Sequence, residues 1–148
     1  MRNSIKERKT KETEINASVN LDGSGLSKIS TNIGFFDHML TSFTKHSLFD
    51  LDLNVIGDLN VDTHHTVEDT GIVLGKAILE ALGDKSGINR YASYTIAMDE
   101  ALVLCAIDLS GRGYFQMDYE FGNPKCGDFE TETTEEFFRA FALNLEAN

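Results

Sequence analysis

The chain has 148 residues, of which 41% are hydrophobic, and a formal net charge of −11 at pH 7. This length suits a single domain with its own core, and no segment reaches the ~20 consecutive apolar residues that would span a bilayer. The negative charge repels nucleic acid and anionic membranes, so neither is an expected partner, whereas a small phosphorylated ligand needs only a few local cations.

The cysteines and the N-terminus favour a reducing compartment. There are two cysteines, Cys105 in an apolar run and Cys126 in a predicted loop, which do not resemble a disulfide framework. Residues 1–6 include the basic residues Arg2 and Lys6 but no apolar segment follows them, so no secretory signal is expected. We therefore expect a cytoplasmic protein in which Cys105 is a small buried hydrophobe.

The first half of the chain predicts strands and helices packed in layers. Residues 14–21 alternate strictly between apolar and polar side chains, which indicates a half-buried strand, and a weaker strand is expected over 26–31. Helical spacing of apolar residues predicts a helix over 32–49, and alternation predicts a strand over 51–55. A second helix carries an apolar stripe and ends at Gly83; the stripe consists of Val67, Gly71, Leu74, Ile78 and Ala81.

The second half begins to repeat this order. An apolar run over 102–109 predicts a buried strand, alternation over 115–121 predicts another strand, and a helix is expected over 135–145. The pair Phe35-Phe36 recurs 102 residues later as Phe137-Phe138, either by chance or because the chain is an internal repeat. We expect one α+β domain over 1–148, with helices on one face of mostly antiparallel sheets. Its pseudo-repeats would cover about 1–90 and 91–148, the second lacking a strand and a helix.

A candidate metal site opens the second helix. In Asp62-Thr63-His64-His65-Thr66-Val67-Glu68-Asp69, helical spacing places His64 and Glu68 on one face, with His65 about 100° around the axis. Imidazole nitrogens with one carboxylate suit borderline divalent ions such as manganese, iron or zinc. The alternative is a polar helix start with solvated histidines.

Seven segments, in this order, resemble the imidazoleglycerol-phosphate dehydratase family of histidine biosynthesis. They are Arg8-Lys9-Thr10-Lys11-Glu12-Thr13, Leu21-Asp22-Gly23-Ser24-Gly25, Phe36-Asp37-His38-Met39-Leu40, the segment from Asp62 to Asp69, Gly87-Ile88-Asn89-Arg90-Tyr91, Met98-Asp99-Glu100-Ala101-Leu102 and Asp108-Leu109-Ser110-Gly111-Arg112. Each segment alone is modest, but together they are highly specific.

The resemblance implies a fold, an assembly and a site. The fold is ribosomal-protein-S5-domain-2-like, with two halves that are each strand-strand-helix-strand-helix, in a homo-oligomer of 24 subunits. Active sites between subunits would each hold two manganese ions. Arg90 and Arg112 correspond to residues that contact the substrate phosphate, and Glu12 to one that contacts substrate and transfers protons. The implied metal ligands, which also contact substrate, are His38, His64, His65 and Glu68.

The same resemblance implies a lyase that converts imidazoleglycerol phosphate to imidazole acetol phosphate and water. Metal coordination would lower the pKa of the substrate's imidazole N–H, so that the ring expels the hydroxyl on the neighbouring carbon. We take Glu12, His65 and Glu68 as catalytic residues, with Glu12 as general acid–base. The family carries a second His-His-x-x-Glu motif, another histidine and a lysine beyond the point where this chain ends. We therefore expect half of the ligand set to be absent and one sheet face to be uncovered.

Two other functions remain open from the residues alone. The chain could be an inactive fragment or a non-catalytic partner subunit of the same family. It could also be a dinuclear-metal phosphohydrolase, although such sites use more bridging carboxylates than histidines.

Overall fold

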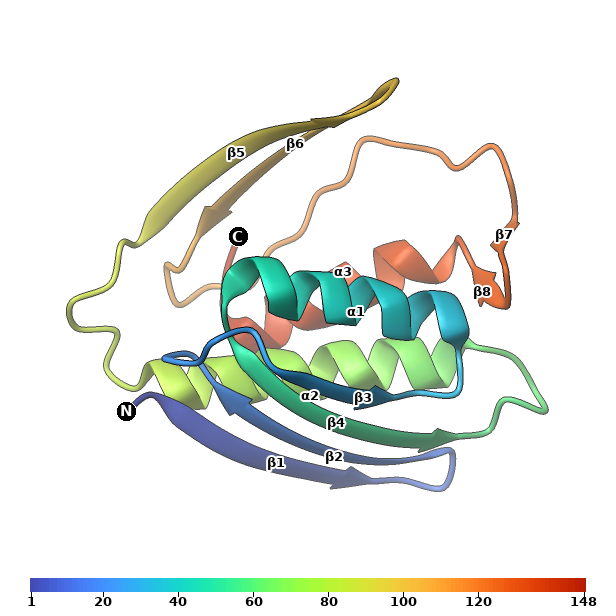
Figure 1. The fold of residues 1–148 in the computed structure, drawn as a ribbon, viewed down its shortest axis with the longest axis horizontal. Helices are drawn as coiled ribbons and strands as arrows, with labels where there is room; N and C mark the ends of the chain where they lie inside the picture. The colour runs from blue at the N-terminus through green and yellow to red at the C-terminus, as the bar shows by residue number, and fades with distance from the viewer.

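The computed structural model describes residues 1–148 and contains three helices and three small sheets (Figure 1). In chain order the elements are β1 (Asn3–Lys9), β2 (Thr13–Asn20), β3 (Ser27–Ser30), α1 (Gly34–Ser47), β4 (Asp50–Gly57), α2 (His64–Leu82), β5 (Tyr91–Met98), β6 (Ala101–Asp108), β7 (Lys125–Cys126), β8 (Phe129–Glu130) and α3 (Thr133–Leu145). None of the three helices is both long and apolar enough to cross a membrane.

The N-terminal half forms a four-stranded sheet in the order β1-β2-β4-β3, in which only the β3–β4 pair is parallel. Alternation in β2 and β4 aligns apolar residues on one face, where Ile15 pairs with Val55 and Ala17 with Leu53. These four residues are buried in the core, and the helices cover their face of the sheet (Figure 1). The predicted strands over 14–21 and 51–55 are therefore confirmed.

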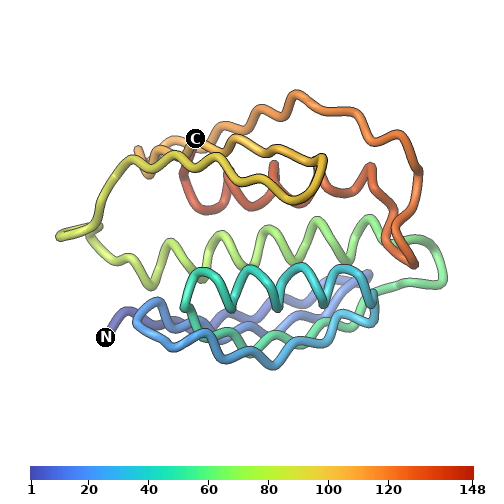
Figure 2. The backbone as a smooth tube through the Cα atoms, turned by 45° about the horizontal axis from the view of Figure 1, so that its top comes forward, coloured from blue at the N-terminus to red at the C-terminus, as the bar shows by residue number.

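The helices form the middle of the molecule, between the four-stranded sheet and the β5–β6 hairpin (Figure 2). α2 packs closely against α3 because Gly71 and Gly75 on α2 have no side chain. A Cβ atom at Gly71 would lie 2.6 Å from the Phe137 carbonyl oxygen, and one at Gly75 would lie 2.6 Å from that of Phe141. The helix that carries the histidines is thus fixed between the sheet and α3.

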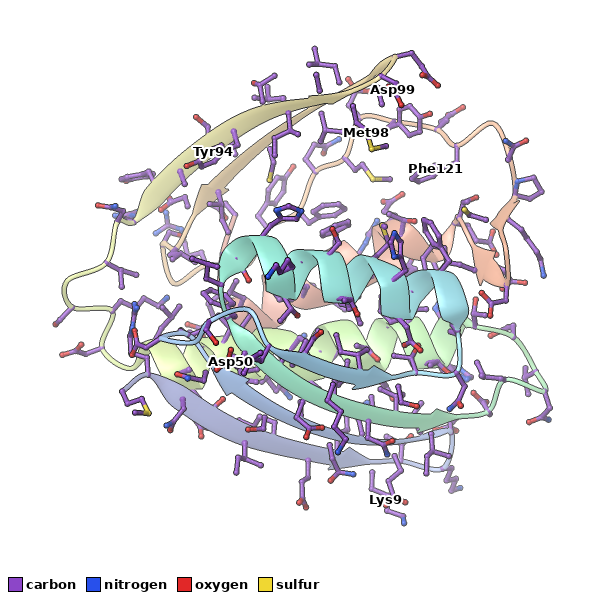
Figure 3. All side chains as sticks on the ribbon, in the orientation of Figure 1. Lys9, Asp50, Tyr94, Met98, Asp99 and Phe121 are labelled. Atoms are coloured by element: carbon purple, nitrogen blue, oxygen red, sulfur yellow. The ribbon has the colours of Figure 1, made fainter.

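The predictions for the second half are partly wrong. β6 forms where a strand is expected, but it belongs to a two-stranded hairpin in which Leu102, Leu104 and Cys105 are exposed, not buried. Figure 3 shows Tyr94 and Met98 on this hairpin, far from the four-stranded sheet. The predicted strand over 115–121 does not form, because no neighbouring segment pairs with it, and alternation alone cannot supply a ladder.

Four strands are also missing from the sequence prediction: β1, β5 and the two-residue strands β7 and β8. In β1, Ile5 faces outward while the half-buried Lys6 and Arg8 face α2, so the strand has no apolar alternation to reveal it. β5 was not predicted either. The first half therefore contains one strand more than expected, but the α+β class with helices on one sheet face is confirmed.

Candidate active site

The first turn of α2 brings a histidine and a carboxylate together. Asp62 accepts a hydrogen bond from the backbone N–H of His64 at 2.8 Å, which stabilises the start of the helix. Nε2 of His64 lies 3.8 Å from Oε2 of Glu68, one helical turn along. Both side chains are more than a third exposed and share one face, as their spacing predicts.

His65 points in a different direction and is held by a carboxylate from another element. Its Nδ1 lies 3.0 Å from Oδ2 of Asp58, in the loop after β4. This hydrogen bond raises the pKa of His65 and outweighs desolvation, which lowers it; the charges of Asp58, Asp62 and Glu12 also raise it. When Nδ1 donates to Asp58, Nε2 is left as the free nitrogen donor.

Asp58 is a site residue that the sequence prediction missed. It lies seven residues before His65 in an irregular segment, so no periodicity connects the two. Its second oxygen, Oδ1, is buried without a hydrogen-bond partner. The only sequence signal is an acidic residue shortly before a histidine pair, and many solvated loops share that feature.

Glu12 lies in the turn between β1 and β2, at the same end of the molecule as His65. Its negative charge is among those that act on His65, although the two residues are far apart in sequence. The hydroxyl of Thr10 shapes this turn by accepting hydrogen bonds from the backbone N–H groups of Glu12 at 3.1 Å and Thr13 at 3.0 Å. The structure therefore brings Glu12 and His65 together.

The predicted ligand His38 does not join this group. It is exposed one turn into α1, and α1 and α2 begin at the same end of the molecule (Figure 1). Within one chain, no three side chains of histidine, cysteine, aspartate or glutamate lie close enough to hold one metal ion. The four predicted ligands therefore do not form a complete site in a single chain.

Basic side chains gather at the other end of α2. Arg90 donates two hydrogen bonds to Asp108, at 2.6 and 3.1 Å, and its guanidinium lies 4.8 Å from the centre of the Tyr91 ring. Arg90 is the largest cause of a lowered pKa for Asp108, and the charges of Arg112 and Lys85 act in the same direction. Lys85 was not singled out in the sequence, because it lies in a turn with no recognisable spacing to the arginines.

The two groups of residues are separated by the length of α2. A helix of 19 residues is about 28 Å long at 1.5 Å per residue. His64 is its first residue, whereas Arg90 follows its last turn, and the two ends of α2 lie at opposite sides of the molecule (Figure 1). One small substrate cannot contact both groups within the same chain.

Comparison with known proteins decides the family. A family model described as imidazoleglycerol-phosphate dehydratase matches residues 31–148. The chain belongs to this family. The family inferred from the sequence motifs is thereby confirmed, and so is the prediction of a dehydratase, a lyase that removes water.

Individual members of the family are similar over nearly the whole chain. The imidazoleglycerol-phosphate dehydratase of Acetivibrio thermocellus is 62% identical over 137 residues, which cover 93% of this chain and 70% of the relative. That of Listeria welshimeri is 56% identical over 148 residues, 100% of this chain and 76% of the relative. The chain thus spans about three quarters of the length of these two relatives.

Solved structures from the family share the fold. The crystal structure of imidazoleglycerol-phosphate dehydratase from Staphylococcus aureus subsp. aureus N315 matches with a TM-score of 0.87 and 39% identity, covering 98% of this chain and 80% of that chain. The Pyrococcus furiosus enzyme in complex with (S)-C348 matches with a TM-score of 0.76 and 32% identity, covering 96% of this chain and 75% of that one.

Proposed function

We propose that this chain is a manganese-dependent dehydratase that converts imidazoleglycerol phosphate to imidazole acetol phosphate and water in histidine biosynthesis. The family match over residues 31–148 is the observation that carries the activity. We further propose a cytoplasmic location, where the free thiols of Cys105 and Cys126 stay reduced.

The donors at the start of α2 fit a divalent metal ion such as manganese. His64 and Glu68 offer a nitrogen and an oxygen 3.8 Å apart, and donors bound to one ion at about 2.1 Å lie at comparable separations. His65 has one ring nitrogen on a carboxylate and the other free, which is the usual arrangement of a metal-binding histidine. A mixed imidazole and carboxylate set suits manganese, iron or zinc.

In a site shared between chains, residues from opposite ends of α2 could contact the same substrate. One chain supplies His64 and Glu68 at the start of α2, which is about 28 Å long, while Arg90 follows the other end and pairs with Asp108, on which the charge of Arg112 also acts. In the proposed homo-oligomer, of 24 subunits as the family resemblance implies, the arginines of one subunit face the histidines of another. His38 and His65 then complete the metal ligands together with residues from elsewhere in the assembly.

Each residue has a separate task in the proposed reaction. Arg90 and Arg112 bind the phosphate through forked donors and hold the substrate in register. His38, His64, His65 and Glu68 would hold manganese, which when bound supplies a Lewis acid for the imidazole ring of the substrate. Glu12 transfers the side-chain proton as the carbon–oxygen bond breaks, and the hydroxyl leaves as water.

Metal binding and dehydration test this proposal together. The purified chain should bind Mn²⁺, measured by electron paramagnetic resonance, and form imidazole acetol phosphate only when Mn²⁺ is present. His64→Gln should weaken Mn²⁺ binding by about tenfold or more, as expected for the loss of a ligand. The matched control is His46→Gln, an exposed histidine on α1 outside the ligand set. Equal Mn²⁺ affinity in the two variants would contradict the assignment.

A second candidate is a non-catalytic partner subunit of the same family. Because no three-residue ligand group forms within one chain, such a subunit would need a partner to complete a metal site, as the shared site above also does. Dehydration that appears only after mixing with a longer homologous chain would support the partner subunit. Phosphate release from a generic phosphoester would instead support the phosphohydrolase.

A further inference from the structure

One buried carboxylate has no task in the proposed chemistry. Asp69 lies on α2 directly after Glu68 and one turn after His65, and it is only 7% exposed. Both of its oxygens are used: Oδ1 accepts a hydrogen bond from the guanidinium of Arg8 on β1 at 2.9 Å, and Oδ2 accepts one from the hydroxyl of Thr13 on β2. The first turns of α2 are thereby tied to both strands that flank the β1–β2 turn.

Hydrogen bonds connect Asp69 to the backbone of Glu12 through Thr13 and Thr10. Thr13 is its sequence neighbour and is 3% exposed, so its hydroxyl has little room to turn away from Asp69. Within the turn, the Thr10 hydroxyl accepts from the N–H groups of Glu12 and Thr13, and the Thr10 N–H donates to the Thr13 carbonyl at 2.8 Å. The turn is internally hydrogen-bonded, so holding Thr13 also holds the backbone of Glu12, whose side chain is exposed.

Simple attachment of β1 to α2 does not require this arrangement. At the other end of the sheet, the hydroxyl of Ser4 donates to the Ala77 carbonyl at 2.6 Å and connects the same two elements without a charge. The Asp69 contacts place a charge-assisted pair, with Asp69 buried and Arg8 half-buried, next to the turn that carries Glu12. If the turn moved, Asp69 would lose these partners and remain as an unpaired buried charge, which is strongly destabilising. The contacts therefore favour one geometry of the turn.

We infer that Asp69, together with Thr13 and Arg8, is a positioning residue that fixes the backbone of Glu12, from which its carboxylate acts, relative to His65 and Glu68. This inference rests on the proposed function, in which Glu12 transfers the proton. A general acid–base has to be within hydrogen-bond reach of the proton it moves, so a loose turn would lower the rate of proton transfer and leave substrate binding nearly unchanged.

The first test needs no activity. In Thr13→Val and in Asp69→Asn, hydrogen exchange of a peptide that contains residues 10–13 should become faster by about tenfold, because the turn opens without global unfolding. Ser4→Ala is the matched control: it removes a buried hydrogen bond between β1 and α2 but should leave exchange at 10–13 unchanged. Exchange at 10–13 that is the same in all three variants and the unmodified chain would overturn the inference, even if no metal binds and no product forms.

The second test separates positioning from general stability. In the dehydration assay, together with a longer homologous chain if activity requires one, Thr13→Val should lower kcat by about tenfold or more with KM changed by less than about twofold. Added to Glu12→Gln, the same substitution should have almost no further effect on kcat, because it acts through Glu12. Additive losses would show a purely structural role and overturn the inference. If Glu12→Gln keeps full activity, the proposed role of Glu12 fails, and the exchange measurement still decides whether the network holds the turn.

Discussion

The close contact between α2 and α3 leads to a stability prediction with a definite sign. In most helices, replacing an interior glycine by alanine stabilises the protein by about 0.5–1 kcal/mol, because alanine loses less backbone entropy. In this protein, a Cβ atom at Gly75 would lie 2.6 Å from the Phe141 carbonyl oxygen and 3.0 Å from Leu145 N and Asn144 Cβ. Two of these neighbours are backbone atoms, so the helix itself has to move.

The steric overlap of the added Cβ atom costs more than the improved helix propensity gains. Overpacking in a well-filled interior costs about 1–3 kcal/mol, so Gly75→Ala should destabilise the protein by a net ~1–2 kcal/mol despite its better helix propensity. Gly71→Ala should behave in the same way, because its Cβ atom would lie 2.6 Å from the Phe137 carbonyl oxygen. Since the two glycines are one helical turn apart on the same face, one displacement of α3 relieves both contacts. The double variant should therefore lose clearly less than the sum of the single losses.

Urea denaturation followed by circular dichroism measures these differences, and the melting temperature should fall by roughly 2–4 °C for each kcal/mol. The matched control is Gly34→Ala at the start of α1, where a Cβ atom would make ordinary contacts of 3.7 Å or more with Asp128. That variant should be as stable as the unmodified chain. If Gly75→Ala equals or exceeds the unmodified chain in stability, α2 and α3 do not cross as closely as the structure describes, and the reasoning is refuted.

Two further predictions concern charged groups near the helix starts. Because hydrogen bonding to Asp58 raises the pKa of His65, protonated His65 should stabilise the folded chain at pH below about 6.5, and this contribution should disappear as the pH rises through the folded-state pKa. In a metal-free NMR titration, Asp58→Asn should lower the pKa of His65 while the control Asp52→Asn leaves it unchanged; an equal pKa in both variants would contradict the assignment. Asp128 accepts hydrogen bonds from the N–H groups of Gly34 at 2.8 Å and Phe35 at 3.4 Å, and the Gly34 bond is the main reason that the pKa of Asp128 is lowered. Its stabilising effect should be present at neutral pH and lost as the pH falls through the folded-state pKa. Asp128→Ala should therefore cost about 1 kcal/mol in urea denaturation at pH 7 and progressively less in acid, whereas an equal cost at both pH values would exclude a role for the charge.

The sequence determined those helices and strands in which the spacing of apolar residues matches the face that is buried. β2 and β4 alternate because one face packs on helices, and α2 carries the stripe from Val67 to Ala81 because that stripe is buried. The spacing of His64 and Glu68 also fixed their shared face, since four residues complete about one helical turn. The ordered motifs identified the family independently of any periodicity.

The tertiary structure decided every relation between residues far apart in the chain. The contacts of Asp58 with His65 and of Asp69 with Arg8 and Thr13 join separate elements, so no local pattern contains them. The separation of Arg90 from His64 follows from the direction in which α2 crosses the molecule, which helical spacing does not give. The failed strand over 115–121 has the same cause, because a strand needs a partner, and only the folded chain determines whether one lies beside it.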